Sequence, residues 1–172
     1  FMNYNMAILE AVNLKEAKVD GDVIPGSAFS GKKSLYYFTF PEIITEIGGG
    51  AFSGSSLSGN IVIPDQTRFI GGQAFARTNI TSVQFSPILE SIEGYAFENC
   101  TSLSGTLNLP ESLKSIGYRA FYGCGFSGQL VLPNELEYLG EAAFCRAGSF
   151  VGNLRIPDQI TELYASTFGY SG

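Results

Sequence analysis

Histidine is absent from the 172-residue sequence, and cysteine is scarce. Histidine is the commonest general base near neutral pH and a common metal ligand, so Ser/His/Asp chemistry, Cys/His chemistry and histidine-based zinc sites are excluded. The three cysteines, Cys100, Cys124 and Cys145, have spacings that fit neither a disulfide framework nor a CxxC metal site. They leave the cellular compartment undecided.

Basic residues are also few, with 10 Lys and Arg against 16 Asp and Glu and a net charge of -6. Nucleic acid and anionic lipid are bound mainly through clustered Lys and Arg, so neither is expected as a partner. No apolar run approaches the roughly 20 residues of a membrane span, and membrane insertion is not expected. The chain begins with Phe1, without a signal-like segment, and we interpret it as a processed form or an excised piece.

A repeat of 22 to 24 residues dominates the chain. Each copy has a small residue followed by Phe, at Phe29, Phe52, Phe75, Phe97, Phe121, Phe144 and Phe168. Four positions before each small residue stands an aliphatic residue: Ile24, Ile47, Ile70, Ile92, Ile116, Leu139 and Leu163. Between these motifs lie alternating runs such as NIVIPD, TLNLPE, QLVLPN and NLRIPD. Alternation predicts a short strand in each repeat, which ends at the proline because proline has no N–H to donate.

Three apolar columns run through these predicted strands and are expected to point inward. The first contains Leu14, Phe40, Ile63, Phe85, Leu109, Leu132 and Ile156. The second contains Val12, Phe38, Ile61, Val83, Leu107, Leu130 and Leu154, and the third contains Leu9, Leu35, Leu57, Ile80, Leu103, Phe126 and Phe150. No single unit can bury its own columns, so the units must stack. We therefore predict a solenoid of seven parallel strands and seven turns.

The segment Gly123 to Gly128 reads GCGFSG and matches the dinucleotide-binding pattern G-x-G-x-x-G. That pattern forms a phosphate site only where it follows a strand and opens a helix. Here it leads into the predicted strand QLVL, with no sign of a helix behind it. We interpret the match as a coincidence of repeat turns and expect no cofactor.

The units IGYRAFYGC followed by FSGQLVLP, and IEGYAFENC followed by LSGTLNLP, resemble the BspA-like leucine-rich repeats. The resemblance implies a right-handed leucine-rich-repeat superhelix, with a parallel β-sheet on its concave face and turns, 3₁₀ pieces or short strands on its convex face. It also implies a bacterial secreted or cell-surface protein associated with adhesion, and a localisation outside the cell. The predicted domain covers residues 1–172 as about seven units of 22–24 residues.

The sequence departs from this pattern in three places. Cysteine stands at the consensus position only in Cys100 and Cys124, and the first unit carries the insertion KEAKVDGDV. The chain stops at Gly172 without a polar closing element. Because solenoids need capped ends, we expect either more protein beyond Gly172 or an open edge that pairs with a partner, including edge-to-edge self-association.

Residues between the inward columns are expected on the concave face, where they form a polar and nearly uncharged surface. They are Tyr37, Thr39, Asn60, Val62, Ser82, Gln84, Thr106, Asn108, Gln129, Val131, Asn153 and Arg155. Amides with tyrosine suit sugars or extended polypeptide, so this surface is the candidate ligand site. A merely solvated face with hydrogen-bonded Asn and Gln ladders is an equal alternative.

A polar column also follows the strand prolines, at Glu42, Asp65, Glu111, Asn134 and Asp158. Stacked carboxylates suit calcium, but the Ca²⁺-loop spacing is absent. We therefore favour side chains that accept backbone N–H bonds and fix turns. No metal site is predicted.

Two carboxylate pairs, Glu90 with Glu93 and Glu135 with Glu137, lie in predicted surface turns with no sign of the burial that a glycosidase pair needs. Cys100 and Cys124 share a column in adjacent units, which suits a disulfide, although buried free thiols are favoured and Cys145 is expected to be more exposed. The sequence thus predicts a non-enzymatic module that binds a protein or glycoprotein. A structural spacer without a ligand is the alternative, and a carbohydrate-active enzyme is a weaker one.

Overall fold

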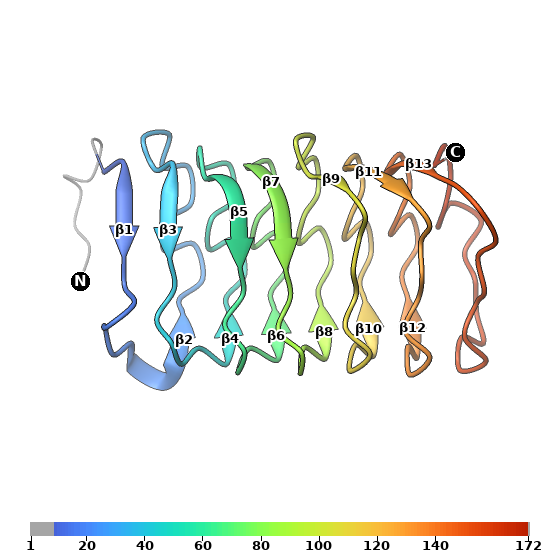
Figure 1. The fold of residues 1–172 in the computed structure, drawn as a ribbon, viewed down its shortest axis with the longest axis horizontal. Coiled ribbons are helices and arrows are strands. Elements are labelled where there is room, and N and C mark those ends of the chain that lie inside the picture. Colours follow the sequence, from blue (N-terminus) through green and yellow to red (C-terminus); the bar gives the residue numbers. More distant parts are fainter. Residues whose placement is uncertain (1–8, 172) are drawn as a thin grey trace.

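The computed structural model describes residues 9–171, which wind into a row of coils stacked side by side (Figure 1). The second to sixth coils each have a front strand, a proline-containing lower turn, a short back strand and a back turn that leads to the next front strand. The front strands are β1 (Ala11–Asn13), β3 (Tyr37–Thr39), β5 (Ser58–Val62), β7 (Asn79–Gln84), β9 (Ser104–Gly105), β11 (Gly125–Gly128) and β13 (Gly148–Phe150). The back strands are β2 (Val23–Ile24), β4 (Glu46–Ile47), β6 (Phe69–Ile70), β8 (Ser91–Ile92), β10 (Ser115–Ile116) and β12 (Tyr138–Leu139). Stacked parallel strands confirm the predicted solenoid.

The back strands form one continuous six-stranded parallel sheet, in the order β12-β10-β8-β6-β4-β2. Ile24, Ile47 and Ile70 lie in register across it, followed by Ile92, Ile116 and Leu139. Every member of this column is buried to 1% exposure or less. The short convex strands expected from the repeat are therefore present. The 3₁₀ piece in the described residues, η1 (Asp20–Asp22), lies in the KEAKVDGDV insertion.

The front strands do not form the single sheet that the sequence predicts. They form three ladders, β1-β3, β5-β7 and β9-β11-β13. The predicted runs TLNL, QLVL and NLRI follow β9, β11 and β13 and lie outside the strands. Front pairing is thus interrupted between β3 and β5 and between β7 and β9.

A glycine recurs at one place in four of the front segments. Gly59, Gly105, Gly128 and Gly152 have φ between 78° and 89°, a left-handed conformation that glycine adopts without steric cost. In the β5–β7 pair the register shifts at Gly59. The fourth coil has no glycine there, and its strand β7 is the longest front strand, with six residues. Strands β9 and β11 end at Gly105 and Gly128, so the glycine limits the front strands of these two coils.

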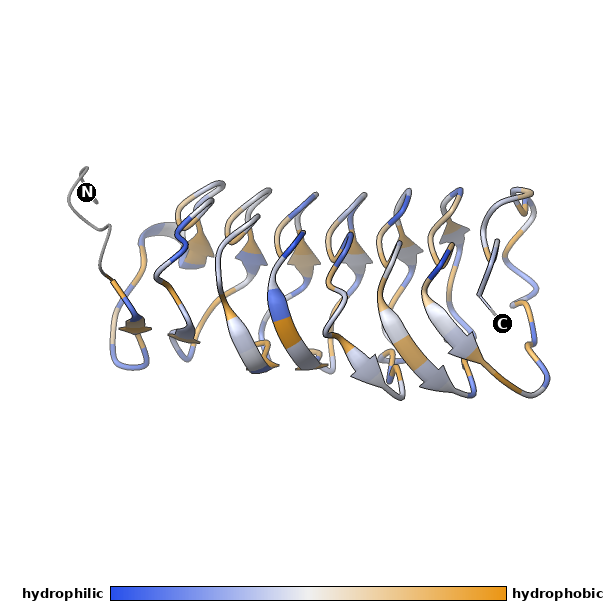
Figure 2. Cartoon of the chain, turned by 90° about the horizontal axis from the view of Figure 1, so that it is seen from above, coloured by the Kyte–Doolittle hydropathy of each residue, from blue (hydrophilic) through white to orange (hydrophobic). Residues whose placement is uncertain are grey.

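The core lies between the front and back strands and is built from the predicted columns. Figure 2 shows hydrophobic residues recurring at equivalent places along the row of coils. Phe52, Phe75, Phe97, Phe121 and Phe144 are completely buried. Neighbouring rings in this ladder lie 5.2 to 5.4 Å apart, with planes within 10° of parallel. The small residue before each of these rings leaves room for this close repeat-to-repeat stacking.

The last coil differs from the others. Leu154, which was predicted to point inward, is 38% exposed. Leu163, whose equivalents in the other six coils are buried, is 50% exposed. Residues 161–164 do not form a seventh back strand. Among the described residues this coil has a neighbour on one side only, so its columns are covered from one side.

Candidate functional site

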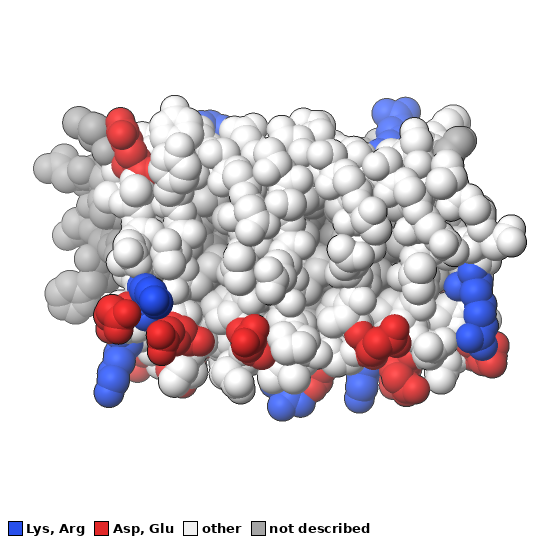
Figure 3. Space-filling view, in the orientation of Figure 1, with Lys and Arg blue, Asp and Glu red and all other residues white. Residues whose placement is uncertain are grey.

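The twelve predicted site residues all lie exposed on the front of the coils, and we call this surface the strand face. Tyr37, Thr39, Asn60, Val62, Ser82 and Gln84 are in β3, β5 and β7. Thr106, Asn108, Gln129, Val131, Asn153 and Arg155 lie in extended segments below β9, β11 and β13. Figure 3 shows that this side of the molecule is mostly uncharged over its middle, with acidic and basic side chains along its lower rim. The alternation of inward and outward residues thus brings the predicted set to one surface.

Hydrogen bonds link a few of these side chains across coils. The Ser82 hydroxyl donates to Asn60 Oδ1 at 2.7 Å, and Gln129 Nε2 donates to the Asn153 carbonyl at 3.3 Å. These are individual links rather than an amide ladder that runs along the whole face. Tyr37 is 67% exposed and Val131 is 59% exposed, so the face also offers apolar contact area. Such a mixture of amide, hydroxyl and apolar groups suits a ligand that is itself polar and weakly charged.

A groove of about 520 Å³ opens at the interrupted seam between β3 and β5, a feature that sequence reasoning missed. Phe38, Phe40 and Val62 line it, and its rim carries Glu42 and Asp65. Phe38 was assigned to an inward column, yet it is only partly buried because no strand ladder closes over the seam.

The polar column after the strand prolines forms the acidic lower rim of the strand face. The Asn134 N–H donates to Glu111 Oε2 at 3.4 Å, and Arg155 contacts both Asn134 Oδ1 at 3.1 Å and Asp158 at 3.6 Å. Residues 9–171 contain no group of three or more acidic or cysteine side chains placed to hold a metal ion.

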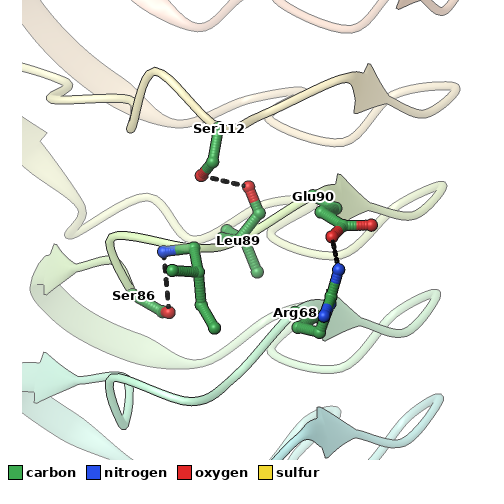
Figure 4. Close-up of polar contacts among 6 residues, drawn as sticks. Arg68, Ser86, Leu89, Glu90 and Ser112 are labelled. Carbon is green, nitrogen blue, oxygen red and sulfur yellow. Dashed lines mark hydrogen bonds and ion pairs between the residues drawn. The ribbon is translucent and has the colours of Figure 1, made fainter.

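Hydroxyl groups, rather than the predicted carboxylates, make most side-chain bonds of these lower turns. Thr67 Oγ1 donates to the Ile44 carbonyl at 2.9 Å, and Ser112 Oγ donates to the Leu89 carbonyl at 2.8 Å (Figure 4). The turns themselves are closed by backbone bonds such as Thr67 N–H to the Pro64 carbonyl. Within residues 9–171, the backbone N–H bond accepted by Glu111 comes from Asn134 of the next coil, so it joins two coils and does not fix the turn of Glu111.

The carboxylate pairs considered for glycoside hydrolysis are engaged in other contacts or exposed. Glu90 forms an ion pair with Arg68 of the preceding coil (Figure 4), and Glu93 accepts a hydrogen bond from Ser91 Oγ at 2.8 Å. Glu135 and Glu137 are exposed. Neither pair lies in a pocket where one carboxyl is buried, which is the environment that raises a catalytic acid's pKa.

The three cysteines are free and buried. Cys100 Sγ donates to the Phe75 carbonyl at 3.0 Å, and Cys124 Sγ donates to the Phe97 carbonyl at 3.2 Å. Burial raises the pKa of Cys100, and burial together with the neighbouring Cys100 raises the pKa of Cys124 well above its usual value. These thiols are packing residues, as predicted.

Cys145 is the most exposed of the three cysteines, as expected, at 8% against 0% for Cys100 and 4% for Cys124. It is nevertheless buried, because the last coil packs on it: a Cβ added to Gly169 would lie 3.5 Å from the Cys145 sulfur.

The segment GCGFSG lies at another place in the repeat than predicted, and it does not form a dinucleotide-binding loop. Its residues Gly125–Gly128 are strand β11 itself, not a turn that leads into QLVL. Residues 129–137, which follow this strand, form an extended segment and a turn, and no helix is formed there. The helix N-terminus on which the phosphate-binding pattern depends is therefore not formed at this position.

Comparison with known proteins agrees with this architecture. A family model described as the BspA type leucine rich repeat region matches residues 22–146 and 57–172, with six copies of the repeat. No curated protein sequence gives a match.

Three bacterial leucine-rich-repeat structures resemble the chain. A protein from Bacteroides ovatus has 25% identity over 78% of this chain, with a TM-score of 0.53. The T. pallidum leucine rich repeat protein has 26% identity over 82%, with a TM-score of 0.50. A leucine rich cell surface protein from Faecalibacterium prausnitzii has 23% identity over 94%, with a TM-score of 0.50. The chain spans 42%, 57% and 51% of the lengths of these three proteins.

Proposed function

Because the chain belongs to the BspA-type leucine-rich repeat family, we propose that it is a non-enzymatic binding module that recognises a protein or glycoprotein through its strand face. Leucine-rich repeat proteins of this kind bind proteins or serve structural roles, and adhesion to host matrix is the specific role proposed for this chain. We also propose that it acts in a secreted or cell-surface protein. Within residues 9–171, no helix has the length and apolarity of a membrane span.

One observation carries the proposal: twelve side chains from six consecutive repeats are all exposed on one surface, over a backbone fixed by a buried aromatic ladder. A rigid repeat scaffold presents such a row at low entropic cost on binding. Only Arg155 among the twelve is charged, so partner recognition would depend on shape, amide hydrogen bonds and apolar contact.

The spacer alternative has support in the hydrogen bonds that some face residues make with each other. Asn60 with Ser82, and Gln129 with Asn153, satisfy part of their bonding capacity internally. A spacer would tolerate substitution of the strand face without loss of any interaction, whereas a binding module would not.

The test is binding of the purified chain to an array of host matrix glycoproteins and glycans. A strand-face variant carries Gln84→Lys, Asn108→Lys and Gln129→Lys, at exposed positions. A matched control carries Gln66→Lys, Gln73→Lys and Gln159→Lys, at exposed positions outside the strand face that add the same charge. Saturable binding that the control keeps and the strand-face variant loses supports the proposal. Absence of binding by all three proteins contradicts the proposal and favours the spacer. Equal binding by all three also contradicts it, because the ligand would then be bound outside the strand face.

A further inference from the structure

Four residues on the back turns of two adjacent coils form an aromatic and cationic cluster. Arg119 Cζ lies 5.2 Å from the centroid of the Tyr118 ring and 4.9 Å from that of Tyr122. Tyr118 in turn packs edge-on against Tyr95 of the preceding coil, with centroids 5.1 Å apart. All four residues are partly exposed. We call this group the Tyr–Arg cluster; it lies outside the strand face and is independent of the function proposed for that face.

The repeat does not require bulky residues at these positions. Where Tyr118 and Arg119 stand, the second coil has Gly49 and Gly50, and the sixth has Glu141 and Ala142. The back turn folds around Phe52 and Phe144 equally well in those coils. The left-handed conformation of Tyr95 and Arg119 is shared by the equivalent Gln73 and Ala142, so the backbone of the turn does not select these side chains either. Neither packing nor backbone geometry therefore accounts for the rings and the guanidinium at this place.

Arg119 has no counter-ion in the part of the chain that the structure describes. Its Nε is buried without a hydrogen-bond acceptor, and the ion pairs of residues 9–171 involve Arg68, Arg77 and Arg155 instead. Arg77, on the edge of the same surface, is paired with Glu98 at 3.1 Å. A guanidinium group held between two rings, partly shielded from water and unpaired, is a strong donor for a carboxylate, which its planar fork matches geometrically.

Several backbone N–H groups around the cluster are already engaged, and this limits the kind of ligand. The N–H groups of Tyr95, Asn99 and Arg119 donate to carbonyls of the next coil at 2.7 to 3.1 Å. An extended polypeptide would find none of these N–H groups free, so recognition has to come from side chains. Three tyrosines offer ring faces for apolar C–H groups and hydroxyls for hydrogen bonds, a combination that suits a sugar ring.

We propose that the Tyr–Arg cluster binds a carboxylate-bearing sugar residue, with the carboxylate on the Arg119 guanidinium and the sugar ring against the tyrosines. The net charge of -6 disfavours long-range attraction of a polyanion, so a single acidic residue in a largely neutral glycan fits this protein better than a heavily sulfated chain.

The test is an NMR titration of the whole chain with methyl glucuronide, which carries the carboxylate, and with methyl glucoside, its neutral counterpart. The Arg119 Nε–H signal and the ring signals of Tyr118 and Tyr122 report directly on the site. The glucuronide is expected to shift these signals saturably, and the glucoside is expected to shift them at least tenfold more weakly. Equal effects of the two sugars, or no effect of the glucuronide up to tens of millimolar, would overturn the proposal. Sodium acetate is the third probe; if it binds as tightly as the glucuronide, the cluster is a carboxylate site without sugar recognition and the proposal fails.

Two variants distinguish binding at this site from a general effect of the protein's charge. Arg119→Gln should weaken glucuronide binding at least tenfold. Arg146→Gln is the matched control, because Arg146 also lies over a tyrosine ring, that of Tyr170 at 5.7 Å, but without further rings around it. Unchanged binding by Arg119→Gln in a protein with parental thermal unfolding, or an equal loss in Arg146→Gln, contradicts the assignment.

Discussion

The rings of Phe97 and Phe121 stack 5.3 Å apart, with planes 8° from parallel, although they belong to successive coils 24 residues apart in the chain. Phe97 makes the same contact with Phe75 at 5.2 Å and is completely buried. Each ring therefore closes the core of its own coil and joins two neighbours.

Phe97→Ala is expected to destabilise the chain by about 3 to 5 kcal/mol, since it removes a large buried ring and leaves a cavity in the ladder. Urea unfolding followed by circular dichroism measures the loss. Tyr37→Ala, at a 67% exposed position, is the control and should cost little. A loss below about 1 kcal/mol for Phe97→Ala would show that the ladder does not hold the coils together.

Thr67→Val tests the hydroxyl bonds between coils. Thr67 is completely buried, and its hydroxyl donates to the Ile44 carbonyl, so valine keeps the shape but leaves that carbonyl without this partner. We expect a loss of about 1 to 3 kcal/mol in the free energy of unfolding. Thr161→Val, at an exposed site, is the matched change and should be nearly neutral. Equal stabilities of the two variants would show that the hydroxyl bond contributes nothing.

Gly117→Ala tests the close approach of the back turns. A Cβ at Gly117 would lie 2.4 Å from the Gly94 nitrogen, a backbone atom that cannot move without displacing the neighbouring coil. We expect a destabilisation of more than about 1 kcal/mol from this overpacking. Gly125→Ala is the comparison, because its nearest backbone atoms lie at 3.3 Å. In thermal unfolding, the midpoint temperature of Gly117→Ala should lie well below that of Gly125→Ala. The reverse order would contradict the packing of the back turns described here.

The buried thiols predict a loss of stability at alkaline pH. Burial raises the pKa of Cys124 in the folded state, so its thiol stays protonated there, whereas the unfolded thiol ionises near about 8.5. The resulting contribution of Cys124 to the free energy of unfolding is fully present below the pKa of the unfolded thiol. It is lost as the pH rises from there toward the pKa of the folded thiol. The free energy of unfolding between pH 7 and 10 should therefore fall less steeply for Cys124→Ala than for the parent chain. Parallel curves would show that the thiol is not shielded as described.

The repeating columns were predictable from the sequence because each position recurs seven times with one chemical character. The ends of the front strands β9 and β11 were not predictable, because they coincide with the left-handed glycines Gly105 and Gly128 rather than with any change in the apolar pattern. Burial of Cys145 and exposure of Leu163 depend on what the neighbouring coil covers, which a single repeat does not reveal.

The candidate site was likewise predictable only in part. Alternation predicted which strand-face residues are exposed, and all twelve are. The groove at the β3–β5 seam and the Tyr–Arg cluster arise from contacts between coils at positions where the repeat varies, so periodicity carried no signal for them. Their residues differ from those of neighbouring repeats, and that departure was the available clue.

The measurement that tests the central claim most directly is hydrogen–deuterium exchange of the chain with and without the glycoprotein that the array retains. Recognition through the strand face predicts added protection in β5, β7 and residues 106–109, with no change in the back strands β6, β8 and β10. Protection confined to the back strands, or none in the front segments at saturating ligand, would contradict a strand-face binding module.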